Sequence, residues 1–212
     1  MRRISRFIPI HIQNYLYERK AHIKARAEMQ QWELNGRPTP PPHSAKQNII
    51  ENYANLYGCE ILIETGTYLG DTIFFQKDNF KKILSVELSE KLYKSAVRRF
   101  RKYSHIEIFF GNSGDLLFKI MADVKSKALL WLDGHYSGGI TARGKTESPV
   151  YKELDAVFAN NKLLHIIMID DARLFIGQRD YPTISELTAF VNNKNPEYKM
   201  VIESDIIILT IL

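Results

Sequence analysis

The chain contains almost no cysteine and no long apolar stretch. Its one cysteine, Cys59, has no partner for an internal disulfide, which is typical of a reducing compartment. No apolar run approaches the roughly 20 residues that span a bilayer. The basic start of the chain has only a short apolar stretch and no small-residue cleavage site, so it does not resemble a signal peptide. We therefore expect a cytoplasmic protein without a transmembrane segment.

Positive charge is concentrated at the beginning of the chain. Residues 1–47 contain nine Lys/Arg and three Asp/Glu, whereas the remainder contains 20 and 21. A nucleic-acid enzyme would more often carry basic residues around its active-site face, so the near-neutral remainder argues against a nucleic-acid substrate.

Residues 1–44 are expected to form a basic arm that is separate from the main domain. The pattern predicts a helix from about residue 10, followed by a linker at 35–42, because consecutive prolines cannot continue a helix. We expect the arm to pack on the body or on a second subunit of a homo-oligomer. Peripheral contact with an anionic membrane surface is the alternative, since basic helices can bind there.

Residues 45–212 alternate between short apolar runs and helical patterns, which indicates one α/β domain. Helices are expected at 45–57, 70–79, 89–102, 114–122, 148–160 and 183–193. Strands are expected at 59–64, 83–87, 105–110, 128–133, 164–169, 198–203 and 205–212. The order predicts a Rossmann-like, doubly wound, mostly parallel seven-stranded sheet. Its last two strands are too close for a helical crossover and should form a C-terminal antiparallel hairpin.

The first predicted strand leads into a turn that contains glycine. The segment reads Glu64-Thr65-Gly66-Thr67-Tyr68-Leu69-Gly70-Asp71-Thr72, and ligands of doubly wound folds bind beside this turn. Gly66 would let the backbone approach a ligand closely. Gly70 precedes a helix whose N-terminal amides could bind a carboxylate, and Glu64 could accept from an amino group.

Two further strand ends strengthen this interpretation. Glu87, followed by Leu88, ends the second strand 23 residues after Glu64, where a Rossmann-like fold holds two ribose hydroxyls. Asn112 and Ser113 follow the third strand, in a position to reach an adenine edge. A solvated strand end or an ordinary turn would explain each signal alone, but three successive strand ends favour a nucleotide-like cofactor.

These segments resemble the first three motifs of class I S-adenosylmethionine-dependent methyltransferases, over roughly residues 45–212. The turn has Thr65 before Gly66 and lacks a full G-x-G-x-x-G motif. This pattern fits the methyltransferase family better than a nicotinamide dehydrogenase. The resemblance implies S-adenosylmethionine as cofactor, bound by Glu64, Thr65, Gly66, Thr67, Tyr68, Asp71, Thr72, Glu87, Leu88, Asn112, Ser113 and Asp133.

Three carboxylates follow the fourth and fifth strands. Asp133 ends one and Asp170-Asp171 follow the other, and such neighbours repel unless a cation or protons compensate. Oxygen ligands favour Mg²⁺, with Mn²⁺ or Ca²⁺ as alternatives. A metal could lower the pKa of a substrate hydroxyl, and His135 would be the catalytic base beside Asp133. Alternatively, Asp170 caps a loop, Asp171 pairs with Arg173, and His135 only orients a neighbouring strand.

The carboxylate motifs resemble those of the macrocin O-methyltransferase group, which are metal-dependent sugar O-methyltransferases. The resemblance implies Asp133, Asp170 and Asp171 as ligands of the divalent cation. The segment Asp-Gly-His-Tyr-Ser-Gly-Gly at 133–139 and the Ala172-Arg173 pair depart from that group, so its acceptor does not carry over. The chain is also similar to bacterial methyltransferase-like proteins associated with surface-polysaccharide synthesis, which suggests a saccharide or small polar acceptor.

The predicted activity is therefore S-adenosylmethionine-dependent O-methylation, assisted by a divalent metal. Two alternatives stay open: metal-independent methyl transfer with His135 as base, and a non-catalytic subunit that binds the cofactor. In the loop after His135, Arg143 and Lys145 could bind an anionic acceptor, or the loop is simply a polar surface segment.

Overall fold

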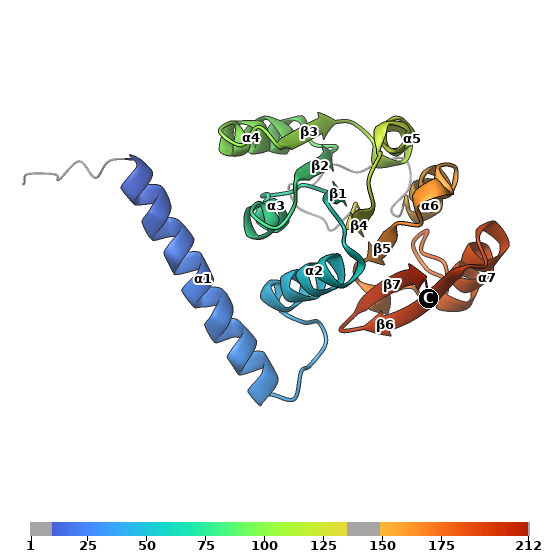
Figure 1. The fold of residues 1–212 in the computed structure, drawn as a ribbon. Helices are drawn as coiled ribbons and strands as arrows, with labels where there is room; N and C mark the ends of the chain where they lie inside the picture. The colour runs from blue at the N-terminus through green and yellow to red at the C-terminus, as the bar shows by residue number, and fades with distance from the viewer. Residues whose placement is uncertain (1–9, 135–148, 212) are drawn as a thin grey trace, which may run out of the picture.

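The computed structural model describes the backbone of residues 10–134 and 149–211, and the side chains of 19–134, 149–160 and 162–211. At its centre lies one seven-stranded sheet with the strand order β3-β2-β1-β4-β5-β7-β6 (Figure 1). The strands are β1 (Ile61–Thr65), β2 (Lys82–Glu87), β3 (Ile106–Phe110), β4 (Ala128–Leu132), β5 (Ile166–Ile169), β6 (Tyr198–Glu203) and β7 (Ile206–Ile211).

Strands β1 to β5 pair in parallel, and β7 pairs antiparallel with both β5 and β6. This topology confirms the predicted Rossmann-like α/β sheet and its C-terminal hairpin. The strand order reverses between β1 and β4. Ligands of open α/β sheets bind beyond the carboxyl ends of the strands at such a reversal.

Helices cover both faces of the sheet (Figure 1). One face carries α2 (His43–Tyr57), α3 (Asp71–Gln76) and α4 (Glu90–Phe100), and the other carries α5 (Ser113–Asp123), α6 (Val150–Phe158) and α7 (Ile184–Lys194). Side chains of a strand alternate between the two faces. Leu62 accordingly packs with the first group and Ile63 with the second, which explains why consecutive residues of β1 are apolar before its polar end.

Helix α1 (Ile10–Leu34) lies beside this layered body (Figure 1). Its His22 ring meets the edge of Phe75 at 5.5 Å between ring centroids. Near the end of α1, Trp32 Nε1 donates a hydrogen bond to the carbonyl of Pro38 in the linker that follows, at 2.8 Å. Across residues 10–134 and 149–211, no helix combines the length and the apolar character of a membrane span.

Several helix and strand ends differ from the sequence expectation by one to three residues, among them the start of β1 and the end of α3. Gly58 adopts φ 64° and ends α2, and Cys59 N donates to Ala54 O, so β1 begins at Ile61 rather than at residue 59. Helix α3 ends at Gln76, three residues earlier than expected.

Candidate cofactor and carboxylate site

The turn after β1 is built against the ends of two neighbouring strands. Gly66 has φ 85°, and its N–H donates to Val86 O of β2 at 2.9 Å. A Cβ added to Gly66 would lie 2.4 Å from the backbone oxygen of Asp133, which follows β4. The structure therefore brings the ends of β1, β2 and β4 into direct contact, and only glycine fits where they meet.

The Glu87 carboxylate is held in one orientation at the end of β2. Tyr68 N donates to its Oε2 at 2.8 Å and Ser89 N donates to its Oε1 at 2.7 Å. The side chain is 5% exposed. A carboxylate oxygen can accept a second hydrogen bond, so both oxygens retain capacity for a pair of vicinal hydroxyls. Leu88 lies next to it and is half-buried.

Glu64 belongs to a buried network below the turn. Ser85 Oγ donates to Glu64 Oε2 at 2.5 Å, and the Thr67 hydroxyl lies 2.6 Å from the same Ser85 oxygen. Burial raises the pKa of the Glu64 carboxyl to about 8, although hydrogen bonds from Ser85 and Thr72 act in the opposite direction. In this structure Glu64 is therefore linked to the turn by hydrogen bonds through Ser85 to Thr67. Its expected contact with an amino group stays a prediction.

The start of α3 is tied to its neighbours by two polar contacts. Gln47 Nε2 of α2 donates to Thr72 Oγ1 at 3.3 Å, while Asp71 pairs with Arg99 of α4 at 3.2 Å. The Thr72 side chain is buried, whereas Asp71 is exposed. Both predicted cofactor residues thus also hold α3 in place.

A polar niche surrounds Gly134. A Cβ added there would lie 3.0 Å from Glu153 Oε1, 3.1 Å from Thr65 Oγ1 and 3.3 Å from Ser113 Oγ. Among the described residues, the buried Thr65 hydroxyl has no hydrogen-bond partner, which is uncommon for a buried polar group. The niche joins three predicted site segments, because Thr65 ends β1, Ser113 begins α5, and Gly134 follows Asp133; Asn112, just before α5, is half-buried.

Asp170 and Asp171 lie at the end of β5 and are bridged by a residue that the sequence analysis did not identify. Lys46 Nζ of α2 lies 2.6 Å from both carboxylate oxygens of Asp170 and 3.3 Å from Asp171 Oδ1. Burial acts to lower the pKa of the Lys46 ammonium, but Asp170, Asp171 and Asp133 outweigh it, so this pKa is raised. Burial also raises the pKa of the Asp170 carboxyl, against the opposing effect of Lys46.

A second cation lies on the other side of Asp171. Arg173 Nη1 contacts Asp171 Oδ1 at 2.7 Å and also pairs with Asp205, which precedes β7. The Arg173 N–H donates to Asp205 Oδ1 at 2.9 Å. The expected alternative, an ion pair between Asp171 and Arg173, is therefore present in the structure.

The predicted metal ligands are not assembled as a metal site. Among the described side chains, those of residues 19–134, 149–160 and 162–211, no group of three or more His, Cys, Asp or Glu is arranged to hold a metal ion. Asp133, Asp170 and Asp171 do lie at one edge of the sheet, since Asp170 N donates to Leu132 O at 3.1 Å. The sequence analysis missed that an ammonium group lies between Asp170 and Asp171. The only sequence signal for this contact was the position of Lys46 among residues at the start of α2 that are largely buried.

His135, Arg143 and Lys145 lie outside the described residues. Their predicted roles as base and as contacts to an anionic acceptor therefore stay predictions.

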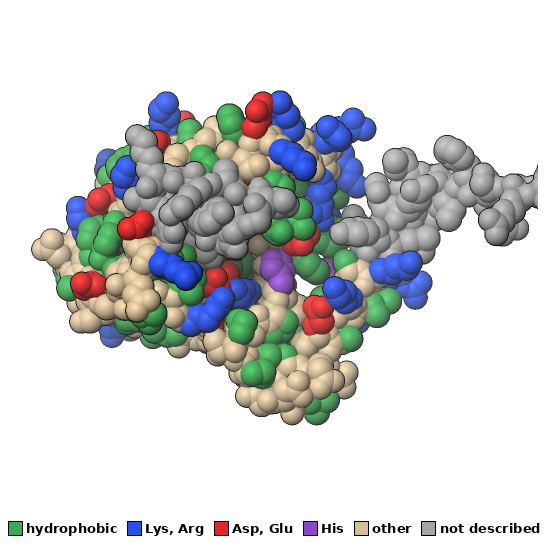
Figure 2. Space-filling view, turned by 180° about the vertical axis from the view of Figure 1, so that it is seen from behind, with side chains coloured by type: hydrophobic (Ala, Val, Ile, Leu, Met, Phe, Trp, Pro, Cys, Tyr) green, Lys and Arg blue, Asp and Glu red, His purple; other side chains and the backbone are tan. Residues whose placement is uncertain are grey.

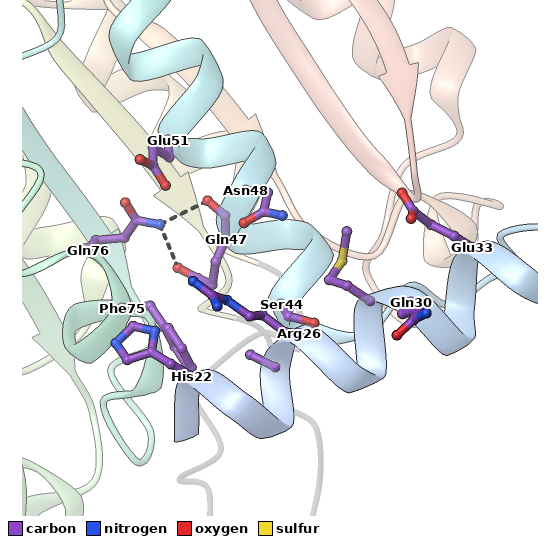
Figure 3. A pocket seen from close by; sticks show the side chains of 12 residues that line it. His22, Arg26, Gln30, Glu33, Ser44, Gln47, Asn48, Glu51, Phe75 and Gln76 are labelled. Carbon is purple, nitrogen blue, oxygen red and sulfur yellow. Dashed lines mark hydrogen bonds between the residues drawn. The ribbon is translucent and has the colours of Figure 1, made fainter. Parts of the chain in front are cut away.

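A groove separates α1 from α2 and α3, with an opening that is visible in the space-filling view (Figure 2). It contains two cavities of about 340 and 600 Å³, a size that suits small molecules. Arg26 and Gln30 of α1 face Gln47 and Asn48 of α2 across the first cavity (Figure 3). The second is lined by residues of α1 and by the starts of α2 and α3, including Asp71, and thus lies beside the glycine turn.

No family model matches the chain, and no curated protein matches it in sequence. Solved structures do match its fold. The O-methyltransferase TomG from Streptomyces achromogenes, in complex with S-adenosylmethionine, has 12% identity and a TM-score of 0.58, covering 89% of this chain and 88% of its own. An O-methyltransferase from Bacillus cereus, in complex with S-adenosylhomocysteine, has 13% identity and a TM-score of 0.59, covering 89% and 90%.

An S-adenosylhomocysteine-bound methyltransferase from Podospora anserina matches in the same way, with 14% identity, a TM-score of 0.57 and coverage of 88% of both chains. The chain thus has the Rossmann-like fold of class I S-adenosylmethionine-dependent methyltransferases, over nearly its whole length.

Proposed function

We propose that this protein is an S-adenosylmethionine-dependent methyltransferase that methylates a hydroxyl group of a sugar or another small polar acceptor. The observation that carries the proposal is the junction of three strand ends. Gly66 contacts the backbone of Asp133, and its turn is hydrogen-bonded to Val86 and, through Tyr68 N, to Glu87. This junction lies at the reversal of strand order, where such folds bind nucleotide-like ligands.

The described residues fit the cofactor chemically. Both Glu87 oxygens can accept hydrogen bonds from ribose hydroxyls. The buried Thr65 hydroxyl can both donate and accept a hydrogen bond. Asn112 and Ser113 follow β3 and are our candidates for contacts to the adenine edge. When bound, the cofactor supplies an electrophilic methyl group on its sulfonium. The chain's own task is then to align an acceptor oxygen with that methyl group.

Asp133 and His135 are our candidates for removing the acceptor proton. Asp133 follows β4 directly at the junction, and His135 comes two residues later in the sequence. A positioned general base typically contributes about 10²–10⁴-fold to the rate. A divalent cation, which the resemblance to macrocin O-methyltransferases implies, does not fit Asp170 and Asp171 as they are arranged, because the Lys46 ammonium lies between them.

Removing the Glu87 carboxylate should weaken cofactor binding. Glu87→Ala is expected to weaken S-adenosylhomocysteine about 10- to 150-fold, from the roughly 1.5–3 kcal/mol of a hydrogen bond to a charged group. Isothermal titration calorimetry measures the change, and circular dichroism checks the fold. Glu90→Ala is the matched control, since Glu90 is exposed in the next helix and pairs with Lys94. Folded wild-type protein that binds no S-adenosylhomocysteine would refute the proposed function.

We further propose that the basic arm serves association, either with a second copy of the chain or with an anionic membrane surface, rather than cofactor binding. Deleting residues 1–40 keeps α2 complete, because this helix begins at His43. The shortened protein should fold and bind S-adenosylhomocysteine as before, and it should either change from an oligomer to a monomer in light scattering or lose binding to anionic lipid vesicles. Well-folded protein that has lost cofactor binding would show instead that α1 completes the site from across the groove.

A further inference from the structure

We propose that Lys46 is the resident cation of the carboxylates that follow β4 and β5, so that this site operates without a divalent metal. The carboxylate cluster comprises Asp133, Asp170 and Asp171. The role of this cluster in methyl transfer rests on the proposed function, whereas its occupation by Lys46 rests on contacts of the described residues.

The Lys46 ammonium lies where a metal bound by Asp170 would lie. Its Nζ is 2.6 Å from both Asp170 oxygens, so it faces the open side of the carboxylate symmetrically, and it reaches Asp171 at 3.3 Å. Ca²⁺ binds carboxylates at about 2.3–2.6 Å and Mg²⁺ at about 2.0–2.1 Å. A divalent ion chelated by both Asp170 oxygens would therefore overlap with the ammonium group, and the two positive charges would repel each other.

The packing of α2 positions Lys46 beside Asp170. The residue lies in the first turns of α2, between the buried residues Ala45 and Gln47. Gln76 Nε2 of α3 donates to both the backbone and the side-chain oxygen of Gln47 at 2.9 Å (Figure 3), which fixes α2 against α3. The side chains of Lys46 and Asp170 are 12% and 5% exposed, so this is not a mobile surface ion pair.

The two aspartates are also satisfied without a metal. Asp171 accepts from Arg173 Nη1 at 2.7 Å, and its own N–H donates to Asp170 Oδ1 at 2.7 Å. Two cations thus compensate the carboxylate pair, which is the condition for keeping such groups together in a buried place. Lys46 is accordingly a positioning residue: it holds Asp170 and Asp171 beside the end of β4, where the acceptor oxygen and Asp133 would meet.

Binding of Mn²⁺, followed by electron paramagnetic resonance, tests this inference without an acceptor. We expect wild-type protein and Lys46→Arg to bind no Mn²⁺ up to about 1 mM, a range that includes even weak carboxylate sites. Lys46→Ala removes the ammonium and should bind Mn²⁺ at least about tenfold more tightly, since Asp170 then loses the cation that faces it and attracts another. Adding Asp170→Asn to Lys46→Ala should abolish the gained binding.

Equal Mn²⁺ binding by wild-type protein and Lys46→Ala, whether tight or absent, would overturn the proposal, because Lys46 would then not control access of a cation. If Lys46→Ala does not fold, Lys46→Met keeps the aliphatic contacts of the side chain without its charge. Mn²⁺ should then raise the Tm of Lys46→Met and not that of the Lys46→Met/Asp170→Asn double variant; equal shifts would refute the inference. A parallel S-adenosylhomocysteine titration tests the proposed function separately.

Discussion

Gly66→Ala should lower the free energy of unfolding by about 2–5 kcal/mol and abolish tight cofactor binding. A left-handed φ of 85° is unfavourable for alanine, at about 1–2 kcal/mol, and forcing extra volume into a packed place adds about 1–3 kcal/mol. The new Cβ would lie 2.4 Å from a backbone oxygen of Asp133, which cannot rotate away. The end of β4 must therefore shift. Urea unfolding gives the stability change, and calorimetry with S-adenosylhomocysteine gives the loss of binding.

Gly58→Ala is the matched control for this substitution. Gly58 also has a left-handed φ, 64°, but a Cβ there would meet nothing within 4 Å. Gly58→Ala should therefore lower the free energy of unfolding only by the cost of the left-handed backbone conformation, about 1–2 kcal/mol, and should keep cofactor binding. Equal losses for Gly66→Ala and Gly58→Ala would contradict the close approach of the glycine turn to β4.

Glu64→Gln should remove a pH dependence of stability on the order of 5 kcal/mol. Burial raises the pKa of Glu64 to about 8 in the folded protein, against an ordinary value of 4.5. Between these values the Glu64 side chain keeps a proton in the folded state that it releases in the unfolded chain, so its contribution to the free energy of unfolding falls as the pH rises from 4.5 to 8. Glutamine cannot ionise and should not show this decline.

Urea unfolding at several pH values between 4.5 and 8 measures the difference between Glu64→Gln and the wild type. Glu60→Gln is a suitable control, because Glu60 is an exposed carboxylate just before β1 whose pKa is lowered by Lys81. It should leave the decline between pH 4.5 and 8 unchanged. If the difference in free energy of unfolding between the wild type and Glu64→Gln stays constant over this pH range, Glu64 is ionised in the folded protein.

Much of the fold is determined by local sequence patterns. Strand and helix order follow from the period of apolar residues, which depends only on backbone geometry. That order, with helices long enough for crossovers, already implies a parallel sheet and its closing hairpin. The carboxyl ends of parallel strands lie at one edge, so Gly66, Glu87 and Asp133 could be assigned to one site before any contact was known.

Sequence alone predicted where the candidate site lies, but tertiary structure decided which partners its charged groups have. Glu64 precedes the glycine turn by two residues, yet strand pairing with β2 places its carboxyl beside Ser85 in the interior, where burial changes its protonation. Lys46 meets Asp170 across 124 residues of sequence. Their contact depends on how α2 packs across the sheet, and no local period encodes that packing. Three aspartates predicted a cation from their mutual repulsion; the packing of α2 made Lys46 a candidate for that cation.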